Sequence, residues 1–287
     1  MKLSDAPVRR PVTDVQVVAF DGDGTRPRPD RLVTEEPMEI RVAGPGQEPV
    51  AFAVAMRTPG SDFELAAGLC LTEGLIAGAD DVAEIAYCLG PEREQMFNIV
   101  TVRLRSPVAA DLRDHRYLAS ASCGICGKAT LDEVEARCAP VGDGPSLPAS
   151  VLVNLPDLLL RRQRVFDQTG GLHAAARFGP DGTLRAVRED VGRHNAVDKL
   201  VGNALLERNL PLADDTLLVS GRLSFELVQK AAAAGIAVLC AVSAPSSLAV
   251  ELAEECGITL IGFLRGPSFN VYTSPFRVIQ ETLTAQA

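Results

Sequence analysis

Two cysteines separated by two residues are the first chemically informative feature of this chain. Cys123 and Cys126 lie in the segment SASCGICGKAT (120–130), and each is followed by a glycine. This spacing serves metal binding, dithiol–disulfide exchange and sulfur transfer. The seven cysteines of the chain include no second pair at this spacing. The rest of the sequence must therefore decide between these chemistries.

A zinc site and a thioredoxin-like dithiol fit the sequence less well than a sulfur carrier does. Zinc needs four ligands, and Cys138 and His115 could complete the set, but their spacing matches no common zinc motif. A thioredoxin-like pair follows a βαβ start, whereas this pair lies mid-chain. A persulfide carrier needs an exposed thiolate that can move. Gly124 and Gly127 would supply the movement, and Lys128 favours the thiolate. Two inert, buried cysteines are disfavoured, because the flanking residues are small.

Composition excludes several classes of function. Hydrophobic residues make up 47% of the 287 residues and charged residues 23%, which is typical of a globular protein. A net charge of −9 argues against a broad nucleic-acid surface. No apolar run reaches the roughly 18 residues of a membrane helix, and no secretory signal is evident, so we expect a cytoplasmic protein without a membrane partner. The remaining cysteines are predicted to be small apolar side chains of the core: Cys70, Cys88, Cys240 and Cys256.

The C-terminal half predicts an α/β domain. LHAAARF (172–178) and LRAVRED (184–190) flank the turn GPDGT and predict a hairpin. Strands are then expected to alternate with helices, which implies a parallel sheet covered on both faces. The expected strands are 216–220, 236–243 and 258–265, and the expected helices are 194–208, 224–235 and 246–257. A short helix is also expected at 155–166.

The N-terminal part is predicted to be smaller and rich in strands. A helix is expected to begin near Asp62, because Ser61 and Glu64 have the spacing of a capping box. Residues 21–30 are predicted to form a turn or loose loop. The expected strands are 38–44, 49–56, 82–88 and 97–104. The predicted organisation is a β-rich region (1–110), the CxxC loop and a linker (111–150), and the α/β domain (151–287). The linker itself is predicted at GDGPSLPAS (142–150).

The carboxyl ends of the predicted strands are the expected place for a ligand. Those ends are Ser220–Arg222, Ser243–Pro245 and Arg265–Ser268. Their arginines and two helix N-termini predict an anion or nucleotide-phosphate site, although ordinary turns have a similar composition.

Asp190, Arg193 and His194 cluster at the start of the helix predicted at 194–208. We expect this cluster to contact ligand, with Arg193 and Arg222 on phosphates; the alternative is a capping Asp190 with solvated neighbours. His173 is predicted to pack or pair locally.

Seven segments between residues 57 and 273 resemble the FdhD family of formate dehydrogenase accessory sulfurtransferases. They are RTPGSDFELAAGLCLTEGLI (57–76), SCGICG (122–127), TGGLHAA (169–175), REDVGRHNAVDKLVG (188–202), SGRLSFELVQKA (220–231), SAPSSLAVELAE (243–254) and GFLRGPSFNVYT (262–273). Together these segments are far more specific than the cysteine pair alone.

The resemblance implies a sulfurtransferase that moves persulfide sulfur from a cysteine desulfurase to the molybdenum cofactor needed by formate dehydrogenase. Cys123 would carry the persulfide, and Cys126 would assist or resolve it. The acceptor would be molybdenum bis(molybdopterin guanine dinucleotide), and a guanine nucleotide could occupy the same site. The family's cofactor-binding segment aligns with Phe263, Leu264, Arg265, Gly266, Pro267 and Ser268. A homodimer without a resident metal is also implied.

The resemblance further implies a cytidine deaminase-like, layered α/β/α C-terminal domain. Ala196 stands where a zinc deaminase has its catalytic glutamate, and 221–224 contains no cysteine, so the zinc site is expected to be lost. The alternative function is a non-catalytic chaperone that binds the nucleotide or pterin cofactor and has a structural CxxC. The sequence leaves open which dehydrogenase is the client and whether its metal is molybdenum or tungsten. It also leaves open whether Cys126 is essential.

Overall fold

A computed structural model of the protein describes residues 2–3, 10–22, 24–88, 97–109 and 140–280. Cys123 and Cys126 lie outside the described residues, as do Cys138 and His115. No α-helix among the described residues has both the length and the apolar character that crossing a membrane requires.

A six-stranded sheet forms the centre of the C-terminal half, in the order β10-β9-β11-β12-β13-β14. The three middle strands β11, β12 and β13 are parallel, and the other neighbours pair antiparallel. The strands are β9 (His173–Phe178), β10 (Leu184–Asp190), β11 (Thr216–Val219), β12 (Val238–Ala241), β13 (Thr259–Arg265) and β14 (Ser268–Val271). Every residue of β11 and β12 is buried, as expected for strands covered on both faces. The predicted hairpin and the predicted parallel strands are confirmed.

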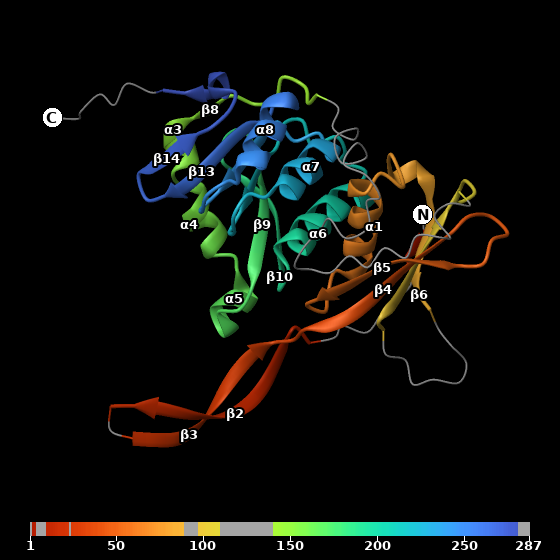
Figure 1. The fold of residues 1–287 in the computed structure, drawn as a ribbon, viewed down its shortest axis with the longest axis horizontal. Coiled ribbons are helices and arrows are strands. Elements are labelled where there is room, and N and C mark those ends of the chain that lie inside the picture. The colour runs from red at the N-terminus through yellow and green to blue at the C-terminus, as the bar shows by residue number, and fades with distance from the viewer. Residues whose placement is uncertain (1, 4–9, 23, 89–96, 110–139, 281–287) are drawn as a thin grey trace.

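Helices cover both faces of this sheet (Figure 1). One face packs against α6 (Arg193–Leu206), α7 (Phe225–Ala233) and α8 (Ser247–Glu255), which are the predicted crossover helices. Ser246 caps α8 by accepting a hydrogen bond from the Ala249 amide. The other face packs against α3 (Ala149–Leu152) and α4 (Leu155–Leu160), and α5 (Arg164–Thr169) follows. The single helix predicted at 155–166 is therefore wrong: Gln163 has ψ 76°, which ends the helical path before α5 begins.

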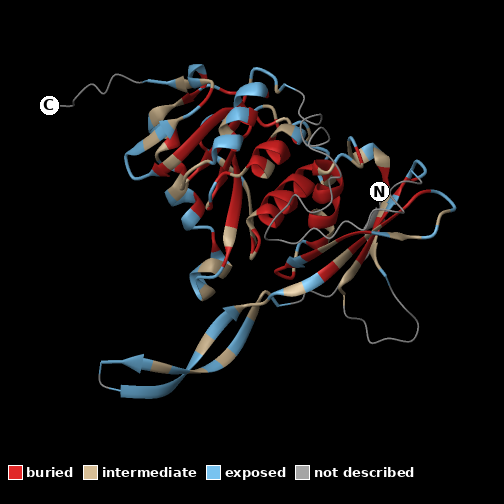
Figure 2. Cartoon of the chain, in the orientation of Figure 1, coloured by how far each residue is buried: buried red, intermediate tan, exposed pale blue. Residues whose placement is uncertain are grey.

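A second, five-stranded sheet lies on the far side of α6, in the order β1-β6-β7-β4-β5. Its strands are β1 (Lys2–Leu3), β4 (Glu36–Ala43), β5 (Val50–Arg57), β6 (Val82–Tyr87) and β7 (Ile99–Leu104). The helix α1 (Asp62–Thr72) packs between this sheet and α6, and one apolar cluster runs from Met38 to Leu260 (Figure 2). The two halves therefore share a core; the division at residues 110 and 150 stays a prediction.

The helices α1 and α6 cross at two glycines. A Cβ atom on Gly68 would lie 1.9 Å from the Asp198 carbonyl oxygen, and one on Gly202 would lie 1.8 Å from the Glu64 carbonyl oxygen. No side chain fits at either position, so the two backbones approach directly. This contact fixes the distance between the N-terminal sheet and the α/β layer.

A two-stranded ribbon, β2 (Val12–Asp21) with β3 (Gly24–Val33), extends away from the rest of the molecule (Figure 1). The predicted loop at 21–30 is wrong, because residues 24–30 belong to β3. Pro27 and Pro29 are two residues apart in β3, so their backbone nitrogens point toward the same edge of the strand. That edge is the outer one, where a strand residue needs no amide donor.

Short elements complete the described chain. They are the 3-10 turns Ala79–Asp81 and Pro275–Arg277, and β8 (Leu147–Pro148) paired with β15 (Val278–Ile279). The linker predicted at 142–150 therefore contains β8 and the start of α3. The helix predicted near Asp62 is confirmed, but its capping box is wrong. Ser61 has a left-handed backbone (φ 55°) and makes no side-chain cap, while Glu64 pairs with Arg188 instead.

Candidate functional site

The carboxyl ends of β11, β12 and β13 meet at one edge of the six-stranded sheet. The Leu223 amide donates to the Ala244 carbonyl (3.1 Å), and the Phe263 amide donates to the Ser243 carbonyl (3.0 Å). The Ser246 amide returns a bond to the Leu223 carbonyl (2.9 Å). The structure therefore brings together the three strand ends that the sequence singled out.

The six residues predicted to bind cofactor span the end of β13, the turn at Gly266 and Pro267, and the first residue of β14. Phe263 has a positive φ of 54°, and the ladder between these strands shifts register between Gly262 and Arg265. Leu264 is fully buried in the core, so it anchors the turn. Arg265 lies 5.7 Å from the centre of the Phe263 ring, and its side chain is exposed. Gly266, Pro267 and Ser268 are exposed as well.

The first turn of α6 carries His194, which joins α6 to the start of α7. Its Nε2 atom lies 3.1 Å from Ser224 Oγ and 2.8 Å from Glu226 Oε2. Burial alone would raise the pKa of Glu226, but the hydrogen bond and charge of His194 outweigh it and lower that pKa. The His194 ring is already engaged by these two partners. Arg222, just before α7, is exposed.

Arg193 is the residue of this edge whose polar atoms are least satisfied. Its Nε atom is buried and has no hydrogen-bond partner among the described residues. A Cβ atom on Gly221 would lie 3.6 Å from Arg193 Cδ and 3.4 Å from His173 Nδ1, so the three residues meet at one point. A guanidinium beside a bare backbone at a helix N-terminus is suited to bind an anion.

His173 is half-buried, and its environment favours the neutral imidazole. Burial lowers the pKa of His173, and the positive charges of Arg193 and His194 lower it further. The sequence predicts that His173 packs or pairs locally. The structure places it close to Gly221 and Arg193 and in the wall of a cavity. Nothing in the sequence around His173 signals this position, because its neighbours come from β11 and α6.

A cavity of about 530 Å³ opens beside His173 at the same edge of the sheet. It lies between the strand ends, the loop that precedes β9, and the helices α4 and α5. Its lining residues are Pro156, Asp157, Leu159, Leu160, Gln163, Phe166, Gly170, Gly171, Leu172, His173, Ser220 and Val242. Sequence reasoning did not single out Gln163, since a glutamine among arginines is typical of an exposed helix.

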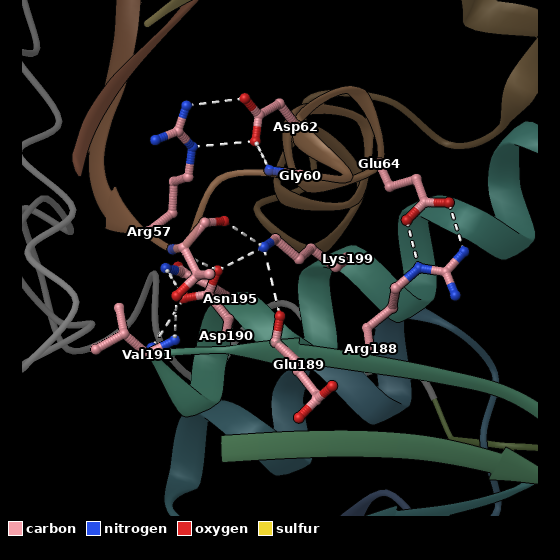
Figure 3. A network of polar contacts seen from close by, with 12 residues as sticks. Arg57, Gly60, Asp62, Glu64, Arg188, Glu189, Asp190, Val191, Asn195 and Lys199 are labelled. Atoms are coloured by element: carbon pink, nitrogen blue, oxygen red, sulfur yellow. Dashed lines mark hydrogen bonds and ion pairs between the residues drawn. The ribbon is translucent and has the colours of Figure 1, made fainter. Parts of the chain in front are cut away.

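A buried polar network surrounds Asp190 at the end of β10 (Figure 3). Asp190 is fully buried and lies 2.6 Å from Lys199 Nζ. It also accepts hydrogen bonds from the amides of Thr58 (3.1 Å) and Gly192 (2.8 Å) and from Asn195 Nδ2 (2.9 Å). These contacts attach the start of α6 to the loop between β5 and α1. Asp190 therefore holds the first turn of α6 in place, and its carboxylate is occupied by protein partners.

The cysteines within the described residues divide into two kinds. Cys70, Cys240 and Cys256 are buried, which confirms their prediction as core residues. Burial raises the pKa of the Cys70 and Cys240 thiols well above the ordinary range. Cys88 is exposed, so its prediction as a core residue is wrong: it lies just past the end of β6. No group of three or more His, Cys, Asp or Glu side chains suited to hold a metal occurs within the described ranges.

The comparisons with known proteins all point to one protein family. The FdhD/NarQ family model matches residues 33–279. A sulfur carrier protein FdhD from Mycolicibacterium paratuberculosis is 52% identical and covers 88% of this chain and 93% of its own. That of Streptomyces coelicolor is 51% identical, covering 94% and 97%. A crystal structure from Desulfotalea psychrophila, described as a formate dehydrogenase accessory protein, has a TM-score of 0.72 at 26% identity and covers 95% of this chain and 100% of its own.

Proposed function

The chain belongs to the FdhD/NarQ family, and on that premise we propose that it carries persulfide sulfur from a cysteine desulfurase to the molybdenum bis(molybdopterin guanine dinucleotide) cofactor needed by formate dehydrogenase. The relatives from Mycolicibacterium paratuberculosis and Streptomyces coelicolor are named sulfur carrier proteins. The solved structure is described as a formate dehydrogenase accessory protein. The proposal specifies the sulfur donor, the sulfur acceptor and the residues that carry the sulfur and bind the cofactor.

Cys123 is the sulfur-carrying residue in this proposal. Three of the four described cysteines are buried, and burial that raises a thiol pKa removes the thiolate that sulfur transfer requires. The Cys123 thiolate would attack the terminal sulfur of the desulfurase persulfide. The S–S bond of the donor then breaks, the desulfurase cysteine leaves as a thiolate, and Cys123 holds the persulfide.

Cys126 is the resolving residue. Attack of its thiolate on Sγ of Cys123 would release the terminal sulfur, which takes up a proton and leaves as hydrosulfide for the cofactor. The two cysteines would then form a disulfide, so their oxidation balances the reduction of the sulfur. A cellular dithiol would restore the pair.

The single observation that carries the binding half of the proposal is the buried, unpartnered Nε of Arg193 beside Gly221. We assign Arg193 and Arg222 to the phosphates of the cofactor's guanine nucleotide, or of a free guanine nucleotide at the same site. The segment from Phe263 to Ser268 would line the approach, with Arg265 presented to solvent and Leu264 as the anchor. His194 would fix the first turn of α6 through Ser224 and Glu226.

The experiment that tests the proposal is complementation of formate dehydrogenase activity by a Cys123→Ala variant. We expect loss of client activity with an unchanged melting temperature. Cys88→Ala, which removes an exposed cysteine outside the proposed pair, is the control and should retain activity. The alternative function is a binding-only chaperone, supported by the buried Arg193 Nε, which has no partner among the described residues and which this alternative also assigns to an anion. It predicts full activity in both variants.

Three further features belong to the same proposal: a homodimer, a cytoplasmic location and a cytidine deaminase-like layering of the α/β half. Light scattering on the purified chain measures the first, and fractionation of cells the second. The order of the six-stranded sheet, with antiparallel β9 and β10 beside three parallel strands, supports the third.

A further inference from the structure

The ribbon of β2 and β3 is a two-stranded sheet, separate from both larger sheets (Figure 2). Its ladder runs through ten consecutive residue pairs without a register shift, and no residue of either strand is buried. At about 3.3 Å per residue, each strand is about 33 Å long. A two-stranded ribbon is only marginally stable in water by itself. Further strands on one of its edges would therefore stabilise it.

The two edges of the ribbon differ. Pro27 and Pro29 point their backbone nitrogens away from β2, so the outer edge of β3 lacks two of the amide donors that an added strand would need. Residues that lie opposite each other in an antiparallel ladder are either bonded to each other or both directed outward. The residues opposite these prolines are Val18 and Gln16, so their amides and carbonyls point outward along the edge of β2.

The outer edge of β2 is suited to pair with another strand. Its sequence VTDVQVVAFD is rich in β-branched residues, and it contains no proline, lysine or bulge to protect the edge. No third strand of the described chain joins this ribbon. The two carboxylates of β2 form ion pairs across the ribbon, Asp14 with Arg31 (3.5 Å) and Asp21 with Arg26 (3.3 Å). The edge therefore offers backbone groups between apolar side chains.

Charge and symmetry favour a second copy of this chain as the partner. The whole chain has a net charge of −9, so two copies repel each other over much of their surface. The charges within the two strands balance, because three arginines face three aspartates: Arg26, Arg28, Arg31, Asp14, Asp21 and Asp30. An antiparallel edge is also complementary to itself, as a twofold interface requires. The ribbon is therefore an element through which two copies can meet at low electrostatic cost.

We propose that β2 pairs antiparallel with β2 of a second copy, so that two ribbons form one four-stranded sheet in the order β3-β2-β2-β3. Outward residues meet outward residues in this pairing, so the even-numbered side chains of both β2 strands lie on one face. Val18 and Phe20, which are 61% and 82% exposed, then contact apolar side chains of the other copy.

This interface deepens the homodimer of the proposed function and rests on that function only for the expectation of a dimer. The family model matches residues 33–279, and β2 precedes that range. Family membership alone therefore does not imply a contact through β2.

Sedimentation velocity of the full chain over a range of concentrations tests the interface with a Gln16→Pro variant. The Gln16 amide points outward, so proline leaves the ladder with β3 intact but removes one donor from each copy at the interface. We expect the dimer dissociation constant to rise about tenfold or more. Thr25→Pro is the matched control, because Thr25 lies opposite Phe20 and adds a third proline to the outer edge of β3. It should dimerise as wild type does.

Hydrogen exchange provides a second measurement that does not depend on a variant. The Val18 amide of wild type should be protected at high protein concentration and lose protection on dilution, whereas the Thr25 amide should exchange rapidly at both. Rapid exchange at Val18 in the dimer would overturn the interface, as would a dimer that Gln16→Pro leaves unchanged or that Thr25→Pro weakens equally.

The outcomes separate this interface from the proposed function. A wild type that stays monomeric would overturn the interface together with the homodimer. Persulfide loading of Cys123 is measured on the same samples and reports on sulfur carriage alone. Normal loading with an unchanged dimer in Gln16→Pro overturns only the interface, whereas absent loading in a wild type whose dimer Gln16→Pro dissociates contradicts only the carrier function.

Discussion

At the scale of single residues, the chemistry of the carboxyl edge follows from which groups are already paired. His194 is occupied by Ser224 and Glu226, whereas Arg193 has a buried Nε without a partner in the described chain. These two neighbouring residues at the start of α6 therefore have different roles. His194 holds the helix start in place, and Arg193 is available to an anion.

Replacing Arg193 with alanine should weaken nucleotide binding. A lost charge-assisted hydrogen bond corresponds to about 1.5–3 kcal/mol, or about a ten- to hundredfold increase in Kd. Calorimetry with GDP measures the change. Arg103→Ala, which removes a half-exposed arginine from β7 in the other sheet, is the control. Unchanged GDP affinity in Arg193→Ala would remove Arg193 from the site.

The lowered pKa of His173 predicts a pH-dependent stability. The unfolded chain binds a proton at this residue below the ordinary pKa of 6.5, whereas the folded chain resists protonation until its lower pKa is reached. Wild type should therefore lose stability as pH falls from 6.5 toward that lower value.

Urea midpoints measured at about pH 7.5 and about pH 5.5 check this dependence against a His173→Gln variant. The other two histidines are present in both proteins. The drop in midpoint between the two pH values should be smaller in the variant. An equal drop would show that the His173 pKa is the same in the folded and unfolded chains.

Residues that meet only in three dimensions could not be predicted from the sequence. His173 lines a cavity because β11 and α6 place Gly221 and Arg193 beside it, and Gln163 is buried because the chain bends between α4 and α5. Neither environment leaves a local pattern. The arginines at the strand ends were predictable, because carboxyl ends of parallel strands share one edge.

At the scale of elements, the strands β9 to β13 and the helices α6 to α8 were predictable because each has a continuous apolar run or a periodic face. The ribbon β2–β3 was not. It has no buried face to impose an alternating pattern, and its glycines and prolines are typical of a loop. The two strands pair along ten residue pairs, and the exposed ion pairs Arg31–Asp14 and Arg26–Asp21 also join them.

Gly68→Ala should destabilise the fold, because its Cβ would lie 1.9 Å from the Asp198 carbonyl oxygen and the helices α1 and α6 would have to separate. The expected loss in free energy of unfolding is about 1–3 kcal/mol or more. Chemical denaturation measures it. Gly78→Ala is the matched control, since a Cβ at Gly78 meets nothing within 4 Å and its backbone is extended. Similar stability of the two variants would contradict direct backbone contact at the crossing.

At the scale of the whole molecule, two sheets are joined through α1 and α6 by a shared apolar core and by the polar network of Asp190. Arg57 is the last residue of β5 and forms a buried ion pair with Asp62, with 2.8 Å between Arg57 Nη2 and Asp62 Oδ2. The segment 57–62 thereby holds the loop that receives the start of α6. The motifs at 57–76 and 188–202, distant in sequence, form one joint in the structure (Figure 3).

Asp190→Ala should weaken this joint strongly, because it leaves the Lys199 ammonium buried without its carboxylate partner. Removing one member of a buried pair costs about 3–5 kcal/mol. Thermal and urea unfolding measure the loss. The control Asp80→Ala breaks an exposed pair with Arg208 and should change stability by less than about 0.5 kcal/mol. A small effect for Asp190→Ala would mean that the apolar core alone joins the two sheets.

The most direct test of the central claim is peptide mass spectrometry after incubation with a cysteine desulfurase and cysteine. We predict one added sulfur atom (about 32 Da), removable by dithiothreitol, on the peptide that contains Cys123. Cys123→Ala should lose the adduct, and the exposed Cys88 should carry none. An unmodified Cys123 beside an active desulfurase would contradict the claim that this chain carries sulfur.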